Sequence, residues 1–227
     1  MPVQPEVILK GLDRMIEKHH LLKHPFYRAW TSGTLSREAL QVYAAQYYQH
    51  VREFPENLRN LASRTSGKLH GLVTENLAEE LDEVNPHPKL WREFAGEIGV
   101  PEKELDSCRL LPGIAALLDT FEELSKNGSY TQAVAAFYVY EAQVPEIVGK
   151  KSEGLRKHYG VTSEKGLRYF AVHEEADVRH RAVWRRWLAG QSEGDLLMAL
   201  PAGERALKAL WGGLDAVYAQ QCCAVKN

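Results

Sequence analysis

Apolar residues recur at helical spacing along almost the whole chain. One face of Val7–Leu22, for example, collects positions i, i+1, i+4, i+7 and i+8. Those positions are Ile8, Leu9, Leu12, Met15 and Ile16. Alternating runs rich in Val, Ile or Thr, which are typical of half-buried strands, are few. The pattern therefore predicts an all-α bundle of about seven to nine helices.

Prolines and capping residues mark the limits of the predicted helices. Ser36 is an N-cap residue type before one helical run, and Pro55 divides that run from a segment that ends near Thr65. Pro145 lies where the helix of Tyr130–Gln143 must end or bend. The other predicted helices are Lys68–Glu83, Pro86–Ile98, a short piece from Pro101, Gly113–Lys126, Glu146–Tyr159, Ser163–Leu188 and Gly194–Ala219. No linker or internal repeat interrupts the series, so we expect a single domain over residues 1–227.

Composition limits the possible partners and the compartment. The chain has 28 Lys and Arg against 30 Asp and Glu, which argues against a general attraction to nucleic acid or anionic membranes. No apolar run approaches the ~18 residues of a spanning helix, and the first residues lack the apolar core of a secretory signal. Cys108, Cys222 and Cys223 cannot all pair within one chain, and none has a metal-type CxxC spacing. We therefore expect a reduced, cytoplasmic protein with Cys222 and Cys223 unpaired.

The clearest candidate chemistry lies in the segment that contains His173, Asp177 and His180. At about 100° per residue, offsets of four and seven bring all three side chains onto one stripe of a helix. Two imidazoles and one carboxylate on a stripe are suitable ligands for a metal bound by nitrogen and oxygen. A solvated polar face is the alternative that the spacing alone leaves open.

Two further patterns are similarly ambiguous. Glu80 and His87 are seven residues apart and share a face if the helix continues, although Pro86 should bend it; a break with a surface His87 is the alternative. Glu141 follows a segment apolar enough to be buried, where an unpaired carboxylate is costly. It therefore needs a partner, which could be a metal, an Arg or a Tyr hydroxyl.

Together the three patterns supply three carboxylates and three imidazoles from several helices. Such residues, when they project inward from facing helices, hold pairs of metals such as iron or manganese. The set contains no thiolate, which argues against structural zinc or an iron–sulfur cluster. The six candidate ligands are Glu80, His87, Glu141, His173, Asp177 and His180.

With this ligand pattern the chain resembles the haem-oxygenase-like dimetal oxidases, most closely the family of the Chlamydia protein associating with death domains. TenA proteins and pyrroloquinoline-quinone synthase are fold relatives of that family. The resemblance runs from KHPFYRAW to the last helix, and its specific part is Glu80-x6-His87, Glu141 and His173-x3-Asp177-x2-His180. It implies a haem-oxygenase-like, TenA-like helical bundle, commonly a homodimer, with two metal ions (Fe/Fe or Fe/Mn), O₂ as co-substrate and an external reductant.

The resemblance also implies an activity. Similar members are self-sacrificing oxygenases that make para-aminobenzoate, a folate precursor, from a tyrosine of their own chain with nitrogen from a lysine. The tyrosine corresponds to Tyr27 and the lysine to Lys151, with Lys150 possible if the match is offset by one. Tyr43 and Tyr140 match tyrosines near the family's metal site.

Ordinary roles compete with each of these assignments. Tyr27, Tyr43 and Tyr140 could be packing residues, and Lys150 and Lys151 a solvated pair. The competing functions are a multiple-turnover dimetal oxygenase of a diffusible molecule, a metal-free enzyme like TenA or pyrroloquinoline-quinone synthase, and a non-enzymatic binding module. TenA-like chemistry needs a pocket cysteine, and the three cysteines of this chain are poorly placed for it.

Overall fold

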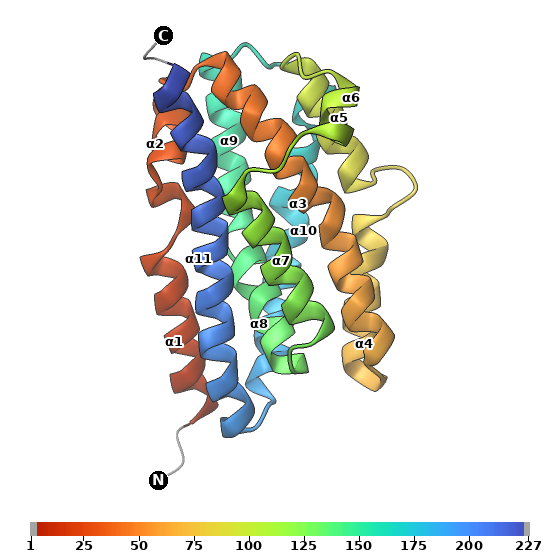
Figure 1. The fold of residues 1–227 in the computed structure, drawn as a ribbon. Helices are drawn as coiled ribbons and strands as arrows, with labels where there is room; N and C mark the ends of the chain where they lie inside the picture. The colour runs from red at the N-terminus through yellow and green to blue at the C-terminus, as the bar shows by residue number, and fades with distance from the viewer. Residues whose placement is uncertain (1–3, 225–227) are drawn as a thin grey trace.

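The protein is built from helices that pack side by side (Figure 1). The computed structural model describes the backbone of residues 4–224, and the side chains in that range except those of Glu175 and residues 221–224. The α-helices are α1 (Pro5–Lys18), α2 (Pro25–Ser32), α3 (Arg37–Arg64), α4 (Gly67–Glu80), α5 (His87–Glu97), α6 (Glu102–Ser107), α7 (Pro112–Lys126), α8 (Tyr130–Glu141), α9 (Val144–His158), α10 (Glu164–Ala189) and α11 (Glu193–Ala224). A short 3-10 turn covers Leu21–Lys23, and residues 4–224 contain no strand. The all-α fold is confirmed, and residues 4–224 contain eleven α-helices, more than the seven to nine expected, with α2 not predicted at all.

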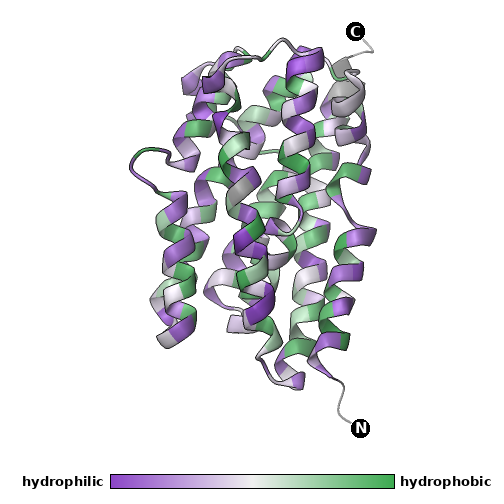
Figure 2. Ribbon diagram, turned by 180° about the vertical axis from the view of Figure 1, so that it is seen from behind, coloured by the Kyte–Doolittle hydropathy of each residue, from purple (hydrophilic) through white to green (hydrophobic). Residues whose placement is uncertain are grey.

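The three longest helices, α3, α10 and α11, organise the bundle. Helix α11 packs against α7 and α8 and lies beside α1, while α3 packs against α4, α5 and α7. Helix α10 contacts α4, α5, α8 and α9, so it is surrounded by the elements that carry the other three candidate ligands and Lys151. Figure 2 shows hydrophobic and hydrophilic segments alternating along these helices, as expected when each has one buried and one exposed side.

Local sequence signals explain where several helices begin and end. The side chain of Ser36 accepts a hydrogen bond from the backbone N–H of Ala39, which confirms it as the N-cap of α3. At α8, Ser129 and Gln132 form a reciprocal capping box. Pro145 falls in the first turn of α9, directly after α8 has ended, as predicted.

Two predicted boundaries differ from the structure. Helix α3 continues through Pro55 without a break, so the predicted division there is wrong. Phe54 and Leu58 on either side are buried, and their packing outweighs the single backbone hydrogen bond that proline removes. Conversely, the helix expected to reach Glu83 ends at Glu80, and residues 81–86 form a loop before α5.

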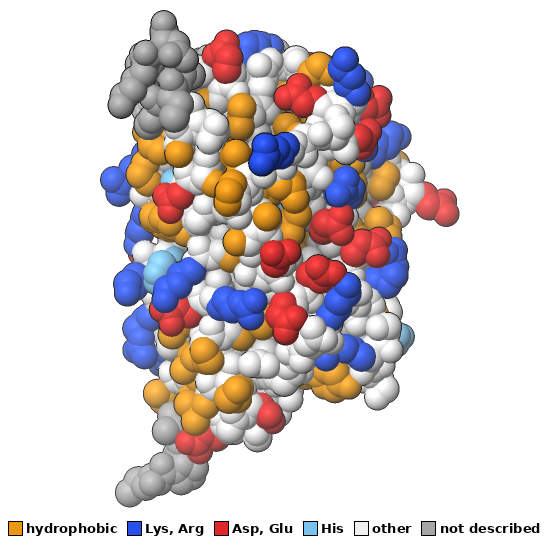
Figure 3. All heavy atoms as spheres, in the orientation of Figure 1, with side chains coloured by type: hydrophobic (Ala, Val, Ile, Leu, Met, Phe, Trp, Pro, Cys, Tyr) orange, Lys and Arg blue, Asp and Glu red, His pale blue; other side chains and the backbone are white. Residues whose placement is uncertain are grey.

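The surface agrees with the balanced composition. On the face drawn in Figure 3, acidic and basic side chains are interspersed and apolar side chains lie between them. None of the described helices is long and apolar enough to cross a membrane.

Candidate metal centre

Six buried side chains from four helices converge inside the bundle. Helix α10 supplies His173, Asp177 and His180, the end of α4 supplies Glu80, the start of α5 supplies His87, and the end of α8 supplies Glu141. Each is at most 6% exposed. They form two groups, here called the first trio (Glu80, His87, His173) and the second trio (Glu141, Asp177, His180), and within each trio the candidate ligand atoms lie within 4.8 Å of one another.

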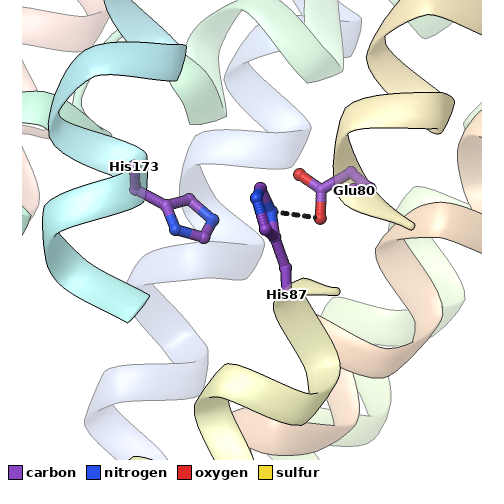
Figure 4. A group of neighbouring side chains, drawn as sticks. All are labelled: Glu80, His87 and His173. Atoms are coloured by element: carbon purple, nitrogen blue, oxygen red, sulfur yellow. Dashed lines mark hydrogen bonds and ion pairs between the residues drawn. The ribbon is translucent and has the colours of Figure 1, made fainter. Parts of the chain in front are cut away.

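In the first trio, all three side chains point toward a common space (Figure 4). His87 Nδ1 lies 2.8 Å from Glu80 Oε2, and the rings of His87 and His173 are 4.1 Å apart. His173 Nδ1 lies 2.7 Å from the backbone carbonyl of Tyr169, to which it donates. Because that nitrogen carries the proton, His173 Nε2 is left with a free lone pair, which is the arrangement of a metal-binding histidine.

In the second trio, His180 Nδ1 lies 3.2 Å from Asp177 Oδ1. Glu141 accepts hydrogen bonds from Asn76 Nδ2, at 2.9 Å, and from the indole N–H of Trp184. Asp177 Oδ2 is buried and has no hydrogen-bond partner among the described residues. A buried carboxylate oxygen without a partner is costly, so this atom indicates a place for a cation.

Burial perturbs the acidity of most of these groups. It raises the pKa of Glu141 to about 8 and that of Asp177 to about 6, and it lowers the pKa of His173 to about 3. Burial alone would lower the pKa of His180, but the surrounding carboxylates, Asp177 first, raise it to about 9. Glu141 and Asp177 can therefore both be ionised near neutral pH only beside added positive charge, which metal ions would provide.

A second buried cluster lies beside the aromatic core. The Tyr43 hydroxyl is 2.9 Å from the Tyr27 hydroxyl and accepts a hydrogen bond from Lys151 Nζ at 2.6 Å. Lys151 is 3% exposed, and aromatic rings surround its Nζ, including those of Tyr27 (5.2 Å to the centroid) and Trp91 (5.5 Å). Because burial disfavours the charged amine, the pKa of Lys151 falls to about 7. Lys150, by contrast, is exposed and pairs with Glu153.

Aromatic residues connect this cluster with the first trio, and Tyr140 directly precedes Glu141 of the second trio on α8. Tyr43 stacks on Tyr47 with a centroid distance of 5.2 Å, and the Tyr47 hydroxyl donates to that of Tyr140 at 3.1 Å. On the other side, Trp91 contacts Tyr169 (4.8 Å), whose ring lies 4.1 Å from that of His173. The predicted residues Tyr27, Tyr43, Tyr140 and Lys151 are therefore all buried in one continuous region with the six candidate ligands.

Comparison with known proteins identifies the family. A family model described as an iron-containing redox enzyme matches residues 41–210, which include all six candidate ligands. The chain belongs to this family. It is 34% identical to a 4-aminobenzoate synthase of Chlamydia muridarum over 95% of this chain and 92% of that protein. It is also 33% identical to a 4-aminobenzoate synthase of Nitrosomonas europaea, over 93% of this chain and 91% of that protein.

The fold comparison agrees with the haem-oxygenase-like, TenA-like architecture expected from the sequence. A TenA homologue from Pseudomonas syringae superimposes with a TM-score of 0.81 over 94% of this chain and 92% of that one, at 15% sequence identity. At that identity the likeness concerns the fold alone. The chain is thus an enzyme of the iron-containing redox family on a TenA-like bundle.

The two trios fit the iron that the family name specifies. Their donors are carboxylate oxygen and imidazole nitrogen, a set suited to iron or manganese, and no described thiol joins them. The contacts between donor atoms, 2.8 Å in the first trio and 3.2 Å in the second, are near the ~3 Å expected for neighbouring ligands about 2.1 Å from a shared ion. Cys108 is a free, half-buried thiol, and the side chains of Cys222 and Cys223 lie outside the described residues.

The sequence did not predict several residues that hold the candidate ligands in place. Asn76 and Trp184 hold the two oxygens of Glu141, and Tyr169 orients His173. Helical spacing could have indicated two of them, since Asn76 precedes Glu80 by four residues and Trp184 follows His180 by four. Tyr169 acts through its backbone carbonyl, which no side-chain pattern reveals.

Proposed function

We propose that this enzyme makes para-aminobenzoate from its own Tyr27, with the amino nitrogen taken from Lys151. The observation that carries the proposal is the Tyr43 hydroxyl, which contacts both the Tyr27 hydroxyl and Lys151 Nζ. A buried amine beside a buried tyrosine has no evident structural purpose, because desolvating the amine is costly. The 4-aminobenzoate synthase relatives, 33–34% identical over nearly the whole chain, support the same product.

The environment of Lys151 suits a nitrogen donor. An amine reacts as a nucleophile only when it is unprotonated. Burial lowers its pKa to about 7, so a large fraction is neutral near neutral pH, whereas an exposed lysine would be almost fully charged. The Tyr43 hydroxyl holds Nζ against the ring of Tyr27 and away from solvent.

The proposed conversion breaks and forms covalent bonds at both Tyr27 and Lys151. The Cα–Cβ bond of Tyr27 breaks, and Cβ is oxidised to the carboxylate carbon of the product. At the ring carbon that carried the hydroxyl, a carbon–nitrogen bond to Nζ forms while the carbon–oxygen bond breaks and its oxygen leaves as water. The Nζ–Cε bond of Lys151 then breaks by hydrolysis, which leaves Cε oxidised to an aldehyde. These are net oxidations, with O₂ as the electron acceptor and an external reductant supplying the remaining electrons. The reaction consumes the side chain of Tyr27, so each chain acts once.

The two trios would hold the metal ions, either two irons or one iron and one manganese. Such a pair supplies the activation of O₂ when it is bound. The residues around it hold it in place: Asn76 and Trp184 orient Glu141, and the Tyr169 carbonyl fixes the tautomer of His173. The low solvent exposure of both trios protects reactive species from water.

The decisive experiment follows labelled atoms. Protein containing ring-¹³C tyrosine and ε-¹⁵N lysine is loaded with Fe²⁺ or with Fe²⁺ and Mn²⁺, then supplied with reductant and O₂, and the released para-aminobenzoate is analysed by mass spectrometry. We expect both labels in at most one product molecule per chain. Tyr27→Phe and Lys151→Met should give no product, while the controls Tyr130→Phe and Lys150→Met should react normally.

The same experiment distinguishes the competing functions. Unlabelled product, or product from Tyr27→Phe, contradicts self-sacrifice. Several turnovers on an added compound would instead identify a conventional oxygenase, and activity after thorough metal removal would identify a metal-free enzyme. Gel filtration with light scattering tests the homodimer that the family resemblance implies.

A further inference from the structure

A fourth acidic residue, Glu79, contacts the second trio from outside. Its Oε2 lies 3.1 Å from His180 Nε2 and 2.9 Å from the guanidinium of Arg179. Glu79 and Glu80 are adjacent at the end of α4, so their side chains leave the helix about 100° apart. Glu80 consequently joins the first trio while Glu79 reaches His180 of α10.

The contact decides which nitrogen of His180 is available. A neutral imidazole carries one proton, and only the nitrogen without it can bind a metal. His180 Nδ1 faces Asp177, within the second trio, and Nε2 faces Glu79. A carboxylate at Nε2 keeps the proton there, leaves Nδ1 free and makes the ring a stronger donor.

The two trios differ in the group that accepts a hydrogen bond from the histidine nitrogen facing away from the proposed metal. In the first trio the outer acceptor is the Tyr169 carbonyl, a backbone atom on the same helix as His173. In the second trio it is a charged side chain from another helix, which depends on the packing of α4 against α10. We propose that Glu79 is a positioning residue that orients His180 toward the metal of the second trio. This inference rests on the dimetal centre of the proposed function.

Glu79 also lies at the solvent side of this trio. A cavity of about 300 Å³ opens between α4 and α10, and its lining includes Glu75, Asn76, Glu79, Arg179, His180 and Trp184. His180 is 6% exposed, whereas the side chain of Glu79 is 29% exposed, so Glu79 is the more solvent-exposed partner of this contact. Arg179 pairs with it from the outside and keeps the carboxylate in place.

Titration with Mn²⁺ alone tests the proposal without relying on product formation. The electron paramagnetic resonance signal of free Mn²⁺ gives the number of bound ions and their affinities. We expect two ions per chain in the unaltered protein, and in Glu79→Ala a loss of about 10–100-fold in affinity at one site only. Glu79→Gln should restore part of the affinity, because its amide oxygen still accepts from Nε2. Glu75→Gln, which alters the same cavity one turn earlier, should bind as the unaltered protein does.

Specific results would overturn the assignment. Two ions bound to Glu79→Ala with unchanged affinity would refute the role of Glu79 and leave the dimetal centre intact. Loss at both sites together with a lower melting temperature of the metal-free variant would show a general structural effect and also refute it. Fewer than about one ion in the unaltered protein would instead refute the dimetal centre itself, and the positioning role with it.

Discussion

Replacing Lys151 with Met should stabilise the protein, most strongly at low pH. Methionine fills a similar volume and carries no charge. Burial lowers the pKa of Lys151 from 10.5 to about 7, and a shift of this size costs the folded state about 5 kcal/mol at and below pH 7. The loss of the hydrogen bond to Tyr43 offsets roughly 1 kcal/mol of the gain.

The pH dependence follows from proton counts. Between pH 7 and 10.5 the unfolded chain holds a proton on Lys151 that the folded chain has released, so the stability of the unaltered protein rises with pH. The advantage of Lys151→Met should therefore be largest below pH 7 and shrink by about 2–3 kcal/mol between pH 6 and pH 9. Groups that do not interact with Lys151 titrate equally in both proteins and cancel in the difference, and His173, whose pKa the charge of Lys151 lowers, titrates at about 3, below this pH range.

Urea unfolding of both proteins without metal, at pH 6 and pH 9, measures this difference. Lys150→Met is the matched control, because Lys150 is exposed and its replacement should show no comparable pH dependence. An equal stability difference at the two pH values for Lys151→Met would refute the reasoning. Lys151 would then titrate as an ordinary lysine, and its suitability as a neutral nitrogen donor would be lost.

Three further predictions concern the ligands, a close helix contact and a cap. His173→Ala should reduce the bound metal from two ions to about one per chain, measured by elemental analysis; unchanged metal content would exclude His173 as a ligand. Gly154→Ala would place a Cβ 2.7 Å from Trp30 and should cost about 1–3 kcal/mol in urea unfolding; a neutral result would show that α2 and α9 can separate easily. Ser129→Ala should cost about 1 kcal/mol in the same assay, and no loss would mean that the capping box of α8 contributes nothing.

The sequence predicted that the six candidate ligands come together, but not how they are grouped. Helical periodicity brought His173, Asp177 and His180 onto one side of a helix, and all three are buried on α10. The structure then divides them, with His173 joining Glu80 and His87, and the other two joining Glu141. Periodicity could not give this division, because it depends on which neighbouring helices face each turn.

Two further pairs of candidate site residues meet through contacts that local spacing along the chain does not predict. Glu80 and His87 meet although α4 ends between them, since the loop of residues 81–86 returns the chain to the same place. Both sequence alternatives, a continuous helix and a break with a surface His87, are therefore wrong. The contact between Lys151 and Tyr43 joins residues 108 positions apart, and no local spacing could have distinguished Lys151 from Lys150.

The burial of Tyr27 has a consequence for the fate of the spent enzyme. Its ring is 2% exposed and packs against Phe26, Trp30 and Tyr43. Under the proposed function, the released product leaves a residue without a side chain in a short helix, at a cost of about 3–5 kcal/mol for the vacated aromatic site and about 1 kcal/mol for the glycine-like backbone. Domains are commonly stable by only about 5–15 kcal/mol. The amine of Lys151 leaves in the same reaction, and the relief of its desolvation cost offsets much of this loss. The consequence that stands is that each chain acts once, so the supply of product would be tied to the rate of translation.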